Sequence, residues 1–193
     1  CDLLVCSAYK FYGPHHGVLW GRRDVLDQIE AYKVRAASNT PPGKFETGTT
    51  NRESLAGVRG AIEHFEWIGS TFGGASDQST RRQRFVAGMH AVDVHERVLT
   101  ARLIEGLQSF PKLKVQGLTE KQALSRRVPT VSFTYAGTDP AEICKAMAAR
   151  NISLWHGHNY GIEPTTRLGL IDKGGVVRVG LAQYNTPEEV DRF

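Results

Sequence analysis

The sequence contains few cysteines and no long apolar run. Its 193 residues include 3 cysteines, and Cys1, Cys6 and Cys144 show no CxxC spacing. A disulfide framework and a four-cysteine zinc site are therefore excluded, and a reducing, cytoplasmic environment fits best. No apolar run approaches the roughly 20 residues that a membrane helix needs, so we expect no membrane partner.

A strong excess of one charge is also absent. The chain has 24 Lys and Arg against 20 Asp and Glu, which gives a net charge of +4. Its basic cluster of Arg81, Arg82 and Arg84 has no interleaved aromatic residues, and such a cluster is typical of a solvated helix face. We therefore expect no nucleic-acid partner, although basic nucleic-acid binding stays open as a third hypothesis.

The composition is that of a globular protein, with 40% hydrophobic and 23% charged residues. The length suits one large domain or two small ones. The first residues show no initiator methionine and no signal peptide, and they read as the interior of a strand. The last residues open a helix of only about two turns, shorter than usual, so we interpret the chain as a fragment.

The first part of the chain is predicted to alternate strands and helices. Leu3 to Cys6 is predicted to be a buried strand, because it is a short apolar run. The spacing of Thr50 and Glu53 is that of a capping box and predicts a helix that starts near Asn51. The other predicted elements are a strand at 17–21, a helix at 22–29, an irregular loop at 33–49 and a Gly/Ser-rich boundary at 69–79.

The second part is predicted to be an α+β lobe. From Arg82 onward, apolar residues recur every three or four positions and predict a long amphipathic helix that ends before Pro111. The following elements are strands at 114–116, 128–135, 152–155 and 176–182, a helix at 140–150 and a final helix that begins near Pro187.

Lys10 is the first candidate for chemistry. It follows the apolar strand and is flanked by Tyr9, Phe11 and Tyr12. Desolvation in such a place lowers the pKa of a lysine toward that of a usable amine nucleophile. The alternative is a surface lysine on a loop.

Gly48, Thr49 and Thr50 form a turn at the predicted start of a helix. Free backbone N–H groups, hydroxyls and the positive end of the helix dipole suit a phosphate there. A plain N-cap explains the same residues equally well. Ser7 is a second hydroxyl that could bind the phosphate.

Arg178 lies in the middle of a predicted strand, with Val177 and Val179 on the opposite face. A buried guanidinium there would bind a carboxylate in bidentate fashion, which suits an amino-acid substrate, or it would pair with a structural acid. The sequence also holds His15, His16, His156 and His158, but no acid or cysteine stands beside them at ligand spacing, so we expect no metal site.

An amine nucleophile, a phosphate site and a carboxylate-binding arginine are what a pyridoxal-phosphate enzyme needs. Three stretches, at 7–14, 45–51 and 175–191, resemble the signature stretches of the class V aminotransferase and cysteine desulfurase family, in the family's order and spacing. The resemblance implies an α/β chain of the fold type I of pyridoxal-phosphate-dependent transferases. Residues 1–75 would be the C-terminal part of the large, cofactor-binding domain. Residues 76–193 would be the connecting helix and the small α+β domain.

The resemblance also implies roles for single residues. Lys10 would hold pyridoxal 5'-phosphate covalently and then move protons at the substrate's α-carbon. Ser7 and Tyr9 would contact the phosphate, although many relatives have histidine where this chain has Tyr9. Thr49 would reach the phosphate of the other subunit of a homodimer, and Arg178 would bind the substrate's carboxylate. A family Asp that pairs with the pyridine nitrogen, and an aromatic that stacks on the ring, lie upstream of these residues, so residues 1–193 alone are expected to be inactive.

The loop ahead of the arginine strand departs from the desulfurase pattern. Desulfurases carry a persulfide-forming cysteine there, whereas this loop has none and Tyr160 falls near that position. We expect the three cysteines to be small buried hydrophobes instead. The sequence thus predicts a cysteine desulfurase-like enzyme acting on a small L-amino acid. An aminotransferase, epimerase or β-lyase of the same family is the alternative, and a non-catalytic dimerisation or interaction domain is the alternative of another class.

Overall fold

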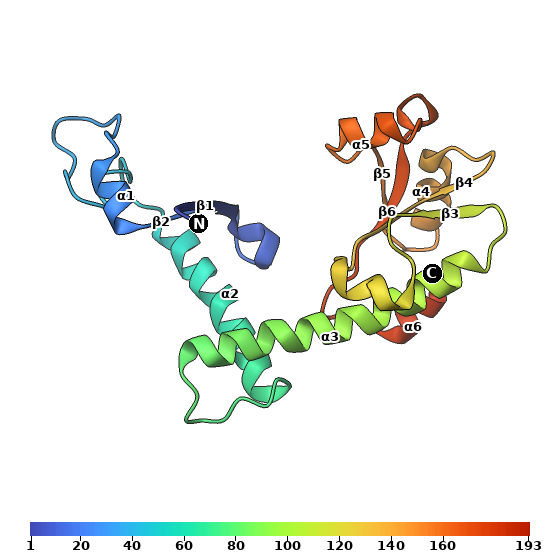
Figure 1. The fold of residues 1–193 in the computed structure, drawn as a ribbon, viewed down its shortest axis with the longest axis horizontal. Coiled ribbons are helices and arrows are strands. Elements are labelled where there is room, and N and C mark those ends of the chain that lie inside the picture. Colours follow the sequence, from blue (N-terminus) through green and yellow to red (C-terminus); the bar gives the residue numbers. More distant parts are fainter. The chain divides into compact units, whose positions relative to one another are not determined.

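The structure is a computed structural model that describes residues 1–193. The chain divides into two compact units, Cys1–Met89 and His90–Phe193 (Figure 1). Helix α3, Arg81–Gln108, begins in the first unit and continues into the second. No helix is both long and apolar enough to cross a membrane. The assignment of 1–75 and 76–193 to parts of two larger domains stays a prediction.

The first unit begins with a two-stranded antiparallel ribbon. Strand β1, Leu3–Ser7, pairs with β2, Gly17–Gly21, and the short 3-10 helix η1, Ala8–Phe11, follows β1 directly. Helix α1 spans Arg23–Gln28 and α2 spans Arg52–Thr71. The predicted strands and helices of this part are therefore confirmed.

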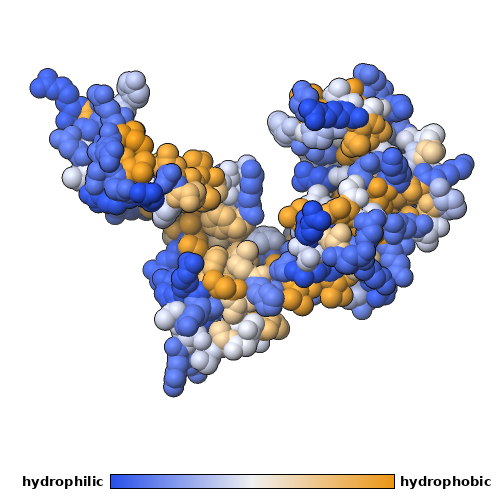
Figure 2. Space-filling view, in the orientation of Figure 1, coloured by the Kyte–Doolittle hydropathy of each residue, from blue (hydrophilic) through white to orange (hydrophobic).

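The burial predicted for the first strand is wrong for this chain. Leu3, Leu4 and Val5 are all exposed, and Val5 is 76% exposed. Apolar side chains of this unit accordingly reach the surface in Figure 2. A continuous apolar run is buried only where a layer covers each face of its sheet, and a ribbon of two strands has too few neighbours for that.

Two glycines let α2 and the start of α3 approach each other closely. A Cβ atom added at Gly69 would lie 1.8 Å from the carbonyl oxygen of Arg84, and one at Gly88 would lie 2.0 Å from that of Phe65. Phe65 and Phe85 also meet edge to face at 5.5 Å between ring centroids. Backbone therefore packs directly on backbone at this crossing, with no space for a side chain.

The second unit is a four-stranded antiparallel sheet in the order β3-β4-β6-β5. Its elements are β3 Leu113–Gln116, η2 Lys121–Arg126, β4 Val131–Tyr135, α4 Pro140–Ala148, β5 Trp155–Gly157, α5 Ile162–Arg167, η3 Ile171–Lys173, β6 Val176–Val179 and α6 Pro187–Arg192. The long helix and the α+β character are confirmed. The strand predicted at 152–155 is wrong in position, because regular pairing begins only at Trp155, opposite Arg178.

One face of this sheet forms the core. Val131 and Phe133 of β4 and Val177 and Val179 of β6 are buried against the C-terminal half of α3, where Leu99, Leu103 and Leu107 are also buried. Alternate residues of each strand point away from this core. The core therefore decides which strand residues are left on the other face.

Helix α6 is held against α3 and capped at its own start. Arg102 forms a bidentate ion pair with Asp191, and this pair lowers the pKa of the Asp191 carboxyl. Thr186 and Glu189 form a reciprocal capping box at its N-terminus. Figure 1 shows α6 alongside α3.

Replacement of Gly69 by alanine is expected to destabilise the protein by about 1–3 kcal/mol, because the new methyl group overlaps the Arg84 carbonyl. Gly60→Ala is the matched control on the same helix. Nothing lies within 4 Å of a Cβ there, so alanine should stabilise the helix by about 0.5–1 kcal/mol. Urea unfolding of both variants measures the difference. Equal changes in stability for the two variants would contradict the close approach of α2 and α3.

Candidate functional site

Lys10 lies in a tight turn at the end of β1. The N–H of Ala8 donates to the carbonyl of His16 at 2.8 Å, and the N–H of Gly13 donates to the carbonyl of Ala8 at 2.9 Å. Tyr12 ends η1 in the left-handed region, with a φ of 67°. A Cβ at Gly13 would lie only 3.0 Å from that of Ala8, which is fully buried. The backbone that carries Lys10 is therefore fixed on both sides.

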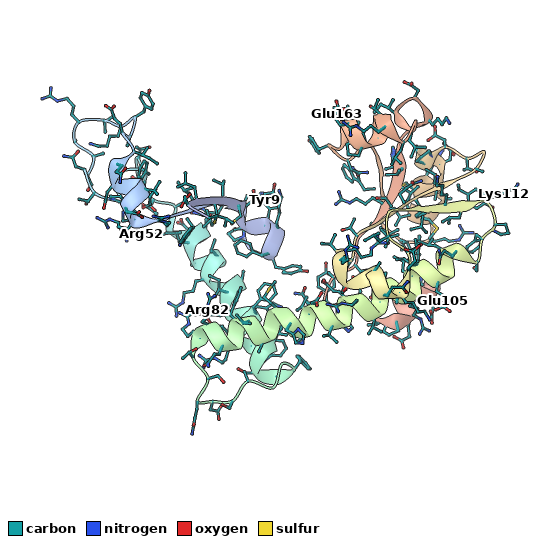
Figure 3. The ribbon with its side chains drawn as sticks, viewed as in Figure 1. Tyr9, Arg52, Arg82, Glu105, Lys112 and Glu163 are labelled. Atoms are coloured by element: carbon teal, nitrogen blue, oxygen red, sulfur yellow. The ribbon has the colours of Figure 1, made fainter.

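The side chain of Lys10 is exposed, so the desolvation expected from the sequence is not provided by this chain. The two-stranded ribbon leaves the turn open, for the reason given for β1. The amine makes no hydrogen bond or ion pair, and its Nζ lies 5.9 Å from the ring centroid of Tyr9. Tyr9 in turn meets His15 edge to face at 5.3 Å; Figure 3 labels Tyr9.

Ser7 precedes this turn and is half-buried. Its side chain does not cap η1, and its backbone is extended. Ser7 therefore stands three residues before Lys10 in the sequence, and its hydroxyl makes no hydrogen bond.

Thr49 lines a groove of about 670 Å³ in the first unit. The groove lies between the start of α2 and the β2–α1 segment, and its lining includes His16, Leu19, Arg23, Phe45, Thr49 and Asn51. Gly48 has a φ of 76°, which favours glycine and turns the chain into the helix. Thr49 is exposed, and its hydroxyl is free of hydrogen bonds.

The capping residue of α2 is Asn51, so the prediction that Thr50 caps this helix is wrong. The Asn51 side chain accepts a hydrogen bond from the backbone N–H of Ser54 at 2.9 Å. Asparagine is as good an N-cap as serine, and here it stands one residue closer to the helix. The hydroxyls of Thr49 and Thr50 consequently make no hydrogen bond.

Arg178 projects from the open face of the second unit's sheet. Its neighbours Val177 and Val179 are buried on the core face, as predicted, but Arg178 itself is exposed rather than buried. The hydrophobic core that holds Val177 and Val179 lies on the opposite face, and this leaves the guanidinium in solvent. No Asp or Glu forms an ion pair with it, so a structural acid partner is not found in this chain.

The loop that follows β5 makes a turn with two consecutive left-handed residues. Asn159 and Tyr160 have φ values of 50° and 61°, and Tyr160 is 99% exposed. The N–H of Tyr160 donates to Nδ1 of His158 at 3.1 Å, and Asn159 Nδ2 donates to the carbonyl of Gly157. These bonds close the turn and present the Tyr160 side chain outward.

The cysteines differ from the expectation of three buried hydrophobes. Only Cys144 is buried, on α4, and burial raises the pKa of its thiol. Cys1 is exposed and Cys6 is half-buried, because both belong to the uncovered ribbon segment. No group of three or more His, Cys, Asp or Glu residues is placed to hold a metal ion.

The structure brings Ser7, Tyr9 and Lys10 together within one turn, in the same unit as Thr49. Arg178 belongs to the other unit. The free groups are an amine, two hydroxyls and a guanidinium, and their chemistry fits an aldehyde, a phosphate and a carboxylate respectively. Sequence reasoning missed Trp155, which lies directly opposite Arg178 on β5, because strand register cannot be read from the sequence.

Comparisons with known proteins give a family and several relatives. The family described as Aminotransferase class-V matches residues 1–193. An aminotransferase-like protein of Gibberella zeae is 32% identical over all of this chain and 44% of its own length. A probable cysteine desulfurase of Mycobacterium leprae is 29% identical over all of this chain and 29% of its own length. The chain thus spans less than half of the relatives named here.

Solved structures share the fold. A cysteine desulfurase of Thermococcus onnurineus covers 100% of this chain with a TM-score of 0.78 and 22% identity, and the match spans 45% of that protein. A cysteine desulfurase of Escherichia coli covers 98% of this chain with a TM-score of 0.73 and 21% identity, over 43% of that protein. The α/β, fold type I architecture expected from the sequence is confirmed by these matches.

Replacement of Asn51 by alanine is expected to destabilise the protein by about 1 kcal/mol, because the N–H of Ser54 loses its acceptor at the helix start. Thr50→Ala serves as the control one residue earlier, and it should change the stability by less than about 0.5 kcal/mol, as is usual for surface sites. Urea unfolding compares the two variants. A larger loss of stability for Thr50→Ala than for Asn51→Ala would show that Thr50 is the N-cap residue.

Proposed function

Because the chain belongs to the class V aminotransferase family, we propose that it is the C-terminal part of a pyridoxal-phosphate enzyme that acts on a small L-amino acid. Two observations support a larger protein. The chain spans only 44% of the Gibberella zeae relative, and the apolar strand β1 is uncovered here. Further layers of the large domain would cover the ribbon and desolvate the turn that carries Lys10.

The observation that carries the proposal is the position of Lys10. A primary amine without a hydrogen bond or ion pair stands directly beyond an apolar strand, on a turn fixed by Ala8 and Gly13. Ligand chemistry in α/β proteins is typically found at this end of a strand. An amine held in this way is available to bind a carbonyl carbon covalently.

Four residues would hold the cofactor. Lys10 would bind it covalently, Ser7 and Tyr9 would donate hydrogen bonds to its phosphate, and Thr49 would reach the phosphate in the other subunit of a homodimer. When bound, pyridoxal phosphate supplies an electron sink for the bond that breaks at the substrate's α-carbon. The Lys10 amine would take and return the proton at that carbon.

Arg178 would bind and orient the substrate. Its guanidinium is exposed, has no acid partner, and projects from a strand whose other face is locked in the core. A bidentate pair with the α-carboxylate would restrict rotation of the substrate and fix which bond to the α-carbon faces the cofactor.

The reaction that we favour is cysteine desulfurase-like, in a cytoplasmic homodimer. The loop at 154–163 contains no cysteine, and Tyr160 stands outward in the turn where a sulfur acceptor would be expected. A phenol forms no persulfide, so transamination, epimerisation or β-elimination is the second candidate reaction at the same residues. A non-catalytic interaction domain is the alternative of another class, and it needs no cofactor at Lys10.

Lys10→Ala in the whole protein is expected to abolish the absorbance band at about 420 nm that a lysine-bound cofactor gives, because alanine has no amine to bind the cofactor covalently. Lys121→Ala, at another exposed lysine, should keep the band. Borohydride reduction followed by peptide mass mapping should place the cofactor on Lys10. A band that survives Lys10→Ala would refute the role of Lys10, and a whole protein without any such band would favour the interaction-domain alternative.

Arg178→Ala is expected to weaken amino-acid binding by about 10- to 150-fold, because a charge-assisted bidentate pair contributes about 1.5–3 kcal/mol. The cofactor band should be unchanged. Arg178→Lys keeps the charge but not the planar fork, so it should recover only part of the loss. Steady-state KM values for the three proteins measure this. Equal KM values for wild type and Arg178→Ala would refute the binding of the substrate's carboxylate by Arg178 and would not affect the role proposed for Lys10.

A further inference from the structure

A row of four residues crosses the open face of the second unit's sheet. In the strand register, Gln116 of β3 is paired with Ser132 of β4, Ser132 with Arg178 of β6, and Arg178 with Trp155 of β5. Directly opposed residues of antiparallel strands have their side chains on the same face. We call these four residues the cross-strand row.

The opposite face fixes which way the row points. Residues on either side of Ser132 and Arg178 along their strands, Val131, Phe133, Val177 and Val179, are all buried in the core. Side chains alternate along a strand, so the row must face away from that core. Figure 3 shows side chains on both faces of the sheet.

Trp155 stands at the outer end of this row and is 66% exposed. Its indole makes no ring contact within this chain, and β5 is an edge strand. The exposed indole therefore stands directly beside the Arg178 guanidinium, which has no ion-pair partner in this chain. Tryptophan and arginine are both enriched among the residues that carry binding energy at interfaces.

The two neighbours of Arg178 in the row are chemically unlike. Trp155 presents a broad apolar surface on one side, and Ser132 presents a small hydroxyl on the other. Directly opposed Cβ atoms lie about 4.5–5.5 Å apart. A carboxylate held by Arg178 therefore has an indole within reach of the carbon atoms that extend from it.

We propose that Trp155 is a specificity-determining residue that contacts the substrate's side chain and selects L-amino acids whose side chain is apolar. This inference rests on the proposed function, because it takes the α-carboxylate to be bound by Arg178. The carboxylate fixes one end of the substrate, and the indole covers the apolar side chain. A charged or hydroxylated side chain would lose water against the indole without gaining a hydrogen bond.

The experiment uses the whole holoenzyme and two carboxylates without an amino group, isovalerate and glycerate, so that binding is measured apart from catalysis. Both bind through a carboxylate, but only isovalerate has an apolar branch. Calorimetry gives Kd for wild type, Trp155→Ala, Trp155→Phe and Arg178→Ala. Trp67→Ala removes another exposed indole, on α2, and is the matched control.

Trp155→Ala should weaken isovalerate binding about 10-fold and change glycerate binding by less than about 2-fold, because an apolar contact of this size is lost only for the branched ligand. Trp155→Phe should retain most of the isovalerate affinity. Arg178→Ala should weaken both ligands alike, and Trp67→Ala should change neither.

Equal changes for the two ligands in Trp155→Ala, or no change for either, would overturn the role of Trp155. The absorbance band of the lysine-bound cofactor separates this failure from that of the proposed function. A holoenzyme that keeps the band while Trp155→Ala changes the binding of both ligands equally, or of neither, refutes only the specificity role. A whole protein with no such band refutes the proposed function itself.

Discussion

The antiparallel pairing of β6 with β4 on one side and β5 on the other is the constraint on which the candidate substrate surface depends. Val177 and Val179 are buried against α3, and the strand's alternation then forces Arg178 to the opposite face. The same pairing brings Ser132 and Trp155 to that face beside it. Core packing therefore positions Ser132, Trp155 and Arg178, whose side chains lie outside the core.

In the first unit, local backbone contacts rather than core packing position the candidate residue Lys10. Its ribbon carries apolar residues on a surface that nothing in this chain covers, yet the turn after β1 is fixed by backbone hydrogen bonds and by close contact between Gly13 and Ala8. Lys10 is thus held in place by local geometry before any tertiary layer surrounds it. Desolvation of its amine is the contribution that the remaining layers of a larger protein would make.

Charge pairing and capping secure the ends of the helices around these surfaces. Asn51 caps α2 next to the groove that Thr49 lines, and Thr186 with Glu189 caps α6, the element that follows β6 in the chain. His95 of α3 additionally lies 3.0 Å from the carbonyl oxygen of Asn185, at the start of α6. The side chains of Ser7, Lys10, Thr49 and Arg178 take no part in these contacts.

The sequence by itself determined the elements and the chemical groups. Apolar periodicity located α3, and the capping and proline signals located α4 and α6. The residues at 7–14, 45–51 and 175–191 identified the family and made Lys10 and Arg178 the candidate site residues. Tertiary structure alone decided the exposure of β1, the true position of β5 and the placing of Trp155 beside Arg178. The physical reason is that periodicity and capping are local properties of a few consecutive residues. Burial and strand register depend on partners far away in the sequence, which local patterns do not specify.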